Sequence, residues 1–433
     1  MPKPIVCLSD VLCQFLESFD ECFSQRQRKY FVTVLLGLVE CEGRSTLKEL
    51  LRCVGEKVSL SGLSRFLSRW PWSPVEVAAV WLVRFRQQME WLVEAEHVRQ
   101  RAQRPKRRGR PRATVVTGYL IFDDSVHTKP KGRKMGGLGR HYSGTEKRVV
   151  RGHCLFTGLY VLLGRRCPLL PRLYRQKSVC EREKVPFQSK VDMAVEELEQ
   201  FEPVPDTHTH VLVDSWYHCK RVRKAAQKRG WDFSGGLKSN RKMRIIAQDG
   251  SRQWLSLSEY AATLEPEDWN EAIWPSQQGG HPVYVHAART WVRKLGPTLV
   301  LITRPSQDAP LEQTRYWGST LVDADAQTVI DILAIRWNIE VFFEDCKDLL
   351  GSDQYQLMSA TAILRFWTLL ACLACFLDEH RYRLQTQQPG THITLGDARR
   401  DLQAQHRRNL LAWLETQFQS GATAEQLCTY LTA

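Results

Sequence analysis

Long uninterrupted apolar runs are missing from this sequence of 433 residues. The longest, from Phe366 to Leu377, covers about a dozen residues, whereas a membrane-spanning helix needs roughly 18–20. The segment from Met1 to Asp10 shows no apolar stretch with a small-residue cleavage site, so no secretory signal is expected. These absences favour a cytoplasmic protein over a membrane or secreted one.

Closely spaced metal ligands are also scarce. The thirteen cysteines are scattered, which predicts reduced thiols rather than disulfides. The one close pair, Cys372-x-x-Cys375, lies in an apolar run without a second pair, so we expect two core thiols and not zinc ligands. His208 and His210 could share one face of a strand, but no third or fourth zinc ligand stands at a usual spacing.

Acidic residues are outnumbered by basic ones. There are 61 Lys and Arg against 47 Asp and Glu, a net charge of +14. A large protein this basic usually meets a polyanion, and nucleic acid is the commonest, although a basic surface can also serve solubility alone. The length suggests about two to four domains.

The first hundred residues carry apolar residues at helical spacing, which predicts an all-α region. Within it, the segment 59–70 resembles the second half of a helix-turn-helix, a motif that binds DNA. Ser59 would begin the helix, and Arg65 and Arg69 would lie on one side of it. An ordinary helix with two solvated arginines is the alternative.

A basic linker follows. Residues 101–112 hold seven basic residues and no acid, and prolines and a glycine prevent a continuous helix. Arg108-Gly109-Arg110-Pro111 matches the core of an AT-hook, in which two arginines enter a narrow minor groove of DNA. A solvated charge run would have the same composition.

Beyond the linker the apolar period changes from helix to strand. Strands are expected at 118–122, 153–163, 169–174, 210–213 and 231–236, and a helix at 190–201. The order β-β-β-α-β is typical of an α/β, RNase H-like sheet. A β-rich insertion over 238–316 and one long helix over about 326–350 complete the pattern. The expected domains are 1–100 (helical, DNA-binding), 101–114 (linker), 115–237 and 317–360 (RNase H-like, in two parts), 238–316 (insertion) and 361–433 (C-terminal helices).

Two of these strands are expected to end in acids. The first closes on Asp123 and Asp124, and the fourth runs into Asp214. In an RNase H-like sheet these strands are neighbours, so their carboxylates would face one another, which is costly unless a cation lies between them. Mg²⁺ prefers such oxygen ligands, and two or three suffice for a two-metal site. An Asp after a strand also commonly starts a turn.

The expected long helix carries Arg336, Glu340 and Lys347 within roughly 40° of one another on one face. This face could present a carboxylate to a metal and two cations to phosphates. An intrahelical ion pair between Arg336 and Glu340 is the simpler alternative.

Four separated motifs resemble those of DDE transposases from bacterial insertion sequences. Arg336-x3-Glu340-x6-Lys347 is similar to the signature Y-x2-R-x3-E-x6-K, with Leu333 at the position of its tyrosine. The segments 122–132, 141–145 and 213–217 resemble the first-Asp, tyrosine-containing and second-Asp motifs, in the same order. The resemblance covers about residues 115–360.

The resemblance implies a DNA transposase. Asp124, Asp214 and Glu340 would be catalytic and would hold two Mg²⁺ or Mn²⁺ ions. Asp124 is preferred because the family's ligand directly precedes Ser or Thr, as Asp124 precedes Ser125, and Asp123 is the alternative. The ions would activate water, or later the freed 3′-hydroxyl, and would stabilise the leaving oxygen.

The same resemblance implies double-stranded DNA as the partner, both the ends of the element and the target. Arg336 and Lys347 would contact phosphates, and Lys129 and Lys131 could add to the same field. A homodimer in the synaptic complex and a nucleoid-associated place in a bacterium follow from this reading. A catalytically silent DNA-binding descendant, a metal-dependent endonuclease without strand transfer and a transcription regulator are the alternatives.

Overall fold

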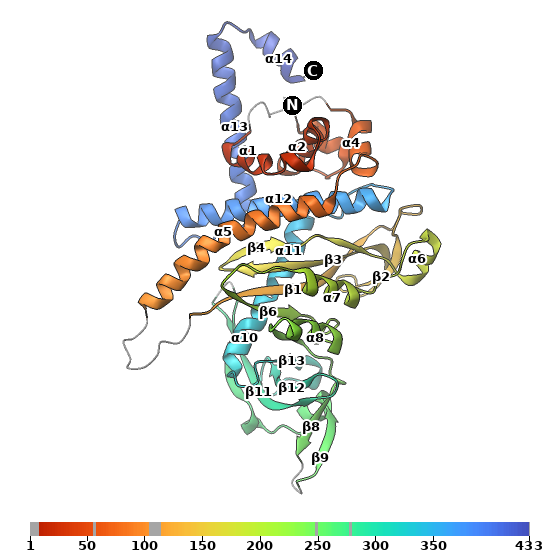
Figure 1. Ribbon diagram of the computed structural model, residues 1–433, viewed down its shortest axis with the longest axis vertical. Helices are drawn as coiled ribbons and strands as arrows, with labels where there is room; N and C mark the ends of the chain where they lie inside the picture. The colour runs from red at the N-terminus through yellow and green to blue at the C-terminus, as the bar shows by residue number, and fades with distance from the viewer. Residues whose placement is uncertain (1–7, 55–57, 104–113, 247–249, 277–278, 433) are drawn as a thin grey trace.

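The computed structural model describes residues 8–54, 58–103, 114–246, 250–276 and 279–432. Figure 1 shows one long sheet, with helices from both ends of the chain packed together at one end of it. The expected fold class is confirmed: a mixed α/β protein whose RNase H-like sheet has helices before and after it.

The N-terminal region is helical. Its α-helices are α1 (Asp10–Glu17), α2 (Gln25–Glu40), α3 (Leu47–Arg52), α4 (Leu60–Ser68) and α5 (Pro74–Ala102). Ser59 caps α4 as expected, because its hydroxyl accepts the Gly62 N–H at 3.0 Å. Helix α5 continues to Ala102, two residues into the segment expected as a linker. Arg101 pairs with Glu94 at 2.9 Å and extends that helix.

The first half of the sheet is built around β1. Its elements are β1 (Val116–Thr128), β2 (Gly139–Ser143), β3 (Arg148–Leu162), β4 (Arg165–Pro168), β5 (Arg172–Tyr174), α6 (Lys177–Glu183), α7 (Lys190–Gln200), β6 (Thr207–Val213), α8 (Lys220–Lys228) and β7 (Asp232–Gly236). The strand order is β2-β3-β1-β6-β7. β1 runs antiparallel to β3 and parallel to β6, so the first and fourth expected strands are neighbours, as predicted.

The β-rich segment continues the same sheet. It contains β8 (Lys242–Ile246), β9 (Arg252–Ser256), α9 (Leu257–Ala261), β10 (Asn270–Trp274), β11 (His281–Val292), β12 (Gly296–Arg304) and β13 (Arg315–Ser319). β13 pairs antiparallel with β7, with Trp317 opposite Gly236. Hydrogen bonds therefore join the strands around β1 directly to those of the β-rich segment.

The single long helix expected over 326–350 is wrong. The structure has α10 (Ala326–Ile335) and α11 (Trp337–Asp348), separated at Arg336. The Asn338 side chain donates to the Ile335 carbonyl at 2.8 Å, which is the acceptor that the Ile339 N–H would use in a continuous helix. The Ile339 N–H bonds the Arg336 carbonyl instead, at 3.2 Å.

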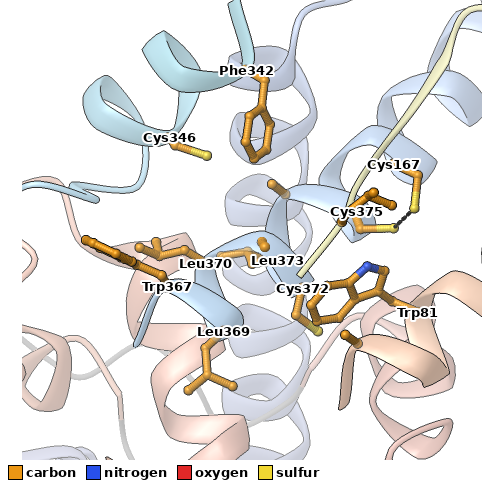
Figure 2. Packing of buried hydrophobic residues seen from close by; sticks show 14 of the residues in the cluster. Trp81, Cys167, Phe342, Cys346, Trp367, Leu369, Leu370, Cys372, Leu373 and Cys375 are labelled. Carbon is orange, nitrogen blue, oxygen red and sulfur yellow. Dashed lines mark hydrogen bonds between the residues drawn. The ribbon is translucent and has the colours of Figure 1, made fainter. Parts of the chain in front are cut away.

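Helix α12 (Ala360–Gln387) forms the centre of the core, and α13 (Leu395–Gln419) and α14 (Ala424–Thr432) follow it. By length and hydropathy α12 could cross a membrane, but 83% of its most apolar window is buried within the protein. Figure 2 shows its apolar residues beside Trp81 of α5 and Phe342 of α11. Cys375 and Cys167 of β4 are free thiols with sulfur atoms 3.9 Å apart, as expected of core cysteines.

Two charged residues of α12 tie the regions together. Arg365 donates to backbone carbonyls of the α4–α5 segment, among them Trp72 at 2.7 Å. Asp378 has a side chain only 2% exposed and pairs with Arg165, Arg166 and Arg381 at 3.0–3.2 Å. The N-terminal helices and the sheet are thus both fixed to one helix.

Candidate active site

The register of two parallel strands places two acids side by side. Phe122 of β1 lies opposite Val213 of β6, so the following residues, Asp123 and Asp214, come next to each other on one face of the sheet. Asp124 points to the opposite face, because successive side chains of a strand alternate. The expectation that Asp124 closes its strand is wrong: β1 continues to Thr128, held in the ladder by β3.

Asp123 faces α11. Its Oδ2 lies 3.4 Å from Nη1 of Arg336, and the same nitrogen lies 3.3 Å from Oε1 of Glu340. Burial raises the pKa of Asp123 well above its ordinary value, and the charges of Asp214, Asp124 and Glu340 add to this effect. One guanidinium thus joins two carboxylates whose mutual repulsion it partly offsets.

Asp214 is held by its own turn. Its Oδ1 accepts the backbone N–H groups of Trp216 at 2.9 Å and Tyr217 at 3.1 Å, which is the side-chain turn expected of an Asp after a strand. Burial raises the pKa of the Asp214 carboxyl, and these two N–H groups oppose that rise. The carboxylate is therefore fixed in orientation at the end of β6.

Asp124 occupies a separate polar cluster on the other face. Its two oxygens accept from Lys190 of α7 and from the Tyr217 hydroxyl, both at 2.7 Å. The Cys154 thiol lies 3.2 Å away. Sequence reasoning missed Lys190 and Tyr217. Lys190 stands 66 residues from Asp124, and only its place at the start of a helix could have drawn attention to it.

The donor chemistry at Asp123, Asp214 and Glu340 suits a hard divalent cation, because carboxylate oxygens are the ligands that such ions prefer. Burial raises the pKa of Asp123 and of Asp214. Among the residues that the structure describes, no group of three His, Cys, Asp or Glu side chains is arranged to hold a metal ion. Arg336 lies between two of the carboxylates instead. The three carboxylates are thus ligands of the type that a divalent cation prefers. In this structure the Arg336 guanidinium supplies the positive charge beside two of them.

The expected phosphate-binding residues of the catalytic region lie in three settings. Arg336 lies at the carboxylates, and Lys347 is half-buried in the last turn of α11. The Lys129 ammonium is 2.8 Å from the Tyr355 carbonyl and 3.7 Å from the centre of its ring. Burial lowers the pKa of Lys129 to about 8. Lys131 is exposed.

The expected DNA-binding residues of the N-terminal region are placed in part. Arg65 and Arg69 both lie exposed, along α4 and at its C-terminal end. Arg108 and Arg110, the AT-hook prediction, lie outside the described residues.

The two histidines considered for zinc have other partners. His208 Nε2 lies 2.7 Å from Oδ2 of Asp232. His210 Nε2 lies 2.8 Å from the Ser234 hydroxyl. Both contacts join β6 to β7 and serve the sheet.

Gly235 keeps β7 close to the strand that carries Asp214. A Cβ at this position would come within 2.2 Å of the Val213 carbonyl oxygen, which is backbone and cannot turn aside. We expect Gly235→Ala to lower the free energy of unfolding by about 1–3 kcal/mol, measured by urea denaturation. Gly43→Ala, with no atom within 4 Å of the added carbon, is the control and should change it by less than about 1 kcal/mol. An equal effect of both variants would contradict the close approach.

Comparison with known families agrees with this geometry. Residues 18–253, more than half of the chain, match the family described as DDE superfamily endonuclease. Residues 189–376, which include Asp214 and Glu340, match the transposase DDE domain. No curated protein was found to match the chain. The chain therefore belongs to the DDE superfamily of endonucleases and transposases.

Proposed function

We propose that this protein is a DNA transposase. It binds the ends of its insertion sequence, cleaves DNA by metal-dependent phosphodiester hydrolysis and joins the 3′-hydroxyl ends to target DNA. The observation that carries the proposal is the placement of Asp123 beside Asp214 on adjacent parallel strands, with Glu340 sharing Arg336 with Asp123. In metal-dependent phosphoryl transfer, carboxylates that lie close together hold the metal ions. The acids on β1, at the end of β6 and on α11 could serve in this way.

Proteins of this family generally use divalent metal ions. In the proposal Asp123, Asp214 and Glu340 hold two Mg²⁺ or Mn²⁺ ions. Bound ions would supply a polarised water and charge stabilisation for the leaving oxygen. Asp124 is the other candidate in the pair, but its oxygens are taken by Lys190 and Tyr217 on the opposite face.

The side chains around the carboxylates position the reactants. The Trp216 and Tyr217 N–H groups fix the orientation of Asp214. Arg336, which lies near both Asp123 and Glu340, would contact the phosphate and would add positive charge where negative charge develops. Arg336 lies at the break between α10 and α11, and Glu340 lies in the first turn of α11.

The two chemical steps exchange one bond at phosphorus for another. In cleavage, a water oxygen attacks the phosphorus and loses its proton, and the bond to the 3′ oxygen breaks and leaves a 3′-hydroxyl. In strand transfer, that hydroxyl oxygen attacks a target phosphate, and a 3′ oxygen of the target leaves and is protonated. Neither step needs an oxidant or reductant, so DNA, water and a divalent cation are sufficient.

The test is incubation of the protein with DNA that carries the terminal inverted repeats of its element, in Mg²⁺ or Mn²⁺. We expect nicking at the repeat ends and joined products with a target plasmid, both lost in EDTA. Asp214→Asn is the control and should bind the same DNA without cutting it.

The products separate the rival functions. Cleavage without joined products would replace the transposase by an endonuclease. Binding without cleavage in both proteins would indicate a catalytically silent DNA-binding protein.

A further inference from the structure

The hairpin formed by β2 and the start of β3 presents an unusual outer face. Arg140 and Tyr142 of β2 and Val149 and Arg151 of β3 alternate with buried neighbours and point outward. Tyr142 and Val149 are opposite each other in the ladder and are 65% and 64% exposed. Large apolar side chains this exposed on a regular hairpin suit contact with a partner.

The same face is strongly basic. Residues 131–151 contain seven basic residues and one acid, Glu146, which pairs with Arg148 at 2.6 Å. Within the described part of the chain, neither Arg140 nor Arg151 takes part in an ion pair. Arg151 instead donates to the Gly132 carbonyl at 3.3 Å, which fixes the loop before β2 against the hairpin.

The two arginines stand directly opposite each other. Arg140 and Arg151 are cross-strand partners in an antiparallel ladder, and like charges in this position destabilise a sheet. Among the residues that the structure describes, no acid pairs with either arginine to offset that cost. A bound polyanion would remove that repulsion. The exposed ring of Tyr142, two residues along β2 from Arg140, offers a surface for sugars or bases.

We infer that this hairpin surface, defined as Lys131, Arg133, Lys134, Arg140, Tyr142 and Arg151, binds the sugar–phosphate backbone of duplex DNA beside the cleavage site. The inference rests on the proposed function and adds a second DNA contact to it. Arg151 lies in β3, five residues before Phe156, the residue opposite Asp124. At about 3.3 Å per residue, it would reach phosphates roughly 15–20 Å from the carboxylates.

The hairpin surface adjoins the N-terminal helices. Lys129 lies just before this surface in the sequence. Burial lowers the pKa of Lys129, and the nearby charge of the exposed Arg44 lowers it further. The Ser45 N–H bonds the Gln354 side chain at 2.8 Å, and Lys129 bonds the next residue, Tyr355. One duplex can therefore follow the hairpin surface toward the helices that carry the predicted DNA-binding arginines.

The experiment measures binding of the full chain to a duplex with one repeat end by fluorescence anisotropy. EDTA prevents cleavage, and KCl is varied from about 50 to 200 mM. For Arg140→Ala/Arg151→Ala we expect a roughly tenfold weaker affinity at 100 mM salt and a salt slope smaller by about 1.8, because two phosphate contacts are lost. Tyr142→Ala should weaken binding severalfold and leave the salt slope unchanged, because it removes an uncharged contact.

The control is Arg400→Ala/Arg407→Ala on α13, whose side chains are 68% and 63% exposed. It should bind within about twofold of the unaltered protein. The melting temperature of the hairpin double variant should stay the same or rise, because like-charge repulsion is removed, and a large fall would instead indicate a structural role.

Other outcomes are equally clear. Unaltered affinity and slope in the hairpin variants would overturn the inference alone, while no binding of DNA by the unaltered protein would overturn the proposed function. In a further test, polyglutamate competes with DNA at an equal concentration of charge. If polyglutamate displaces the DNA, the hairpin surface binds an acidic protein instead, and the DNA assignment is overturned.

Discussion

Asp123→Asn should lower the rate of Mg²⁺-dependent DNA cleavage by roughly 10³-fold or more, whereas Asp124→Asn should lower it by less than about tenfold. A lost metal carboxylate removes about 4 kcal/mol of transition-state stabilisation, and Asp123 is the acid on the face of Asp214 and Glu340. Asp124 lies on the other face of the sheet, where it accepts hydrogen bonds from Lys190 and Tyr217. Its amide should cost stability, about 1–3 kcal/mol, because a largely buried lysine loses its anion.

Single-turnover cleavage of a repeat-end duplex measures the first effect, and urea denaturation measures the second. The two amides are isosteric with the acids they replace, so each variant is the control for the other. Binding in EDTA shows that both still hold DNA. The opposite ranking of the two rates would assign the metal to Asp124, the residue that sequence resemblance favours.

Asp378→Ala should lower the free energy of unfolding by about 3–5 kcal/mol, because it leaves buried cations without their anion. Burial works against the charged form of Asp378, but Arg381, Arg166 and Arg165 hold its pKa below the ordinary value. The side chain is 2% exposed and joins α12 to β4. Loss of this carboxylate therefore removes the polar link between the central helix and the sheet.

Urea denaturation, monitored by far-ultraviolet circular dichroism, measures the difference in the free energy of unfolding between the variant and the unaltered protein. Asp323→Ala removes a partner of Arg289 that is 87% exposed, and it should cost less than about 1 kcal/mol. If the Asp378 variant lost no more than this control, the buried network would contribute nothing to the stability of the fold.

Much of the fold could be predicted from local patterns. The apolar run before Asp214, the amphipathic helix over 190–201 and the strand at 232–236 each carry their own signal, and their order indicates a parallel pairing of β1 with β6. Ser59, which caps α4, could also be predicted from the local sequence. These features depend on residues close together in the sequence.

The site could be predicted only in outline. Choosing between Asp123 and Asp124 requires the register of β1 against β6, and a shift of one residue exchanges the two faces. The break at Arg336 depends on the rotamer of Asn338, which competes for one carbonyl. The contact of Lys190 with Asp124 joins residues far apart in the sequence, and a local pattern gives no sign of it.

The continuity of the sheet through β7 and β13 has a consequence for association. An RNase H-like sheet that stopped at β7 would expose a row of unpaired N–H and C=O groups, a template for pairing with another chain. Here Trp317, Gly318 and Ser319 occupy that edge. Strand β13 thus covers the edge of β7, and its removal would leave that edge open to pairing with another chain.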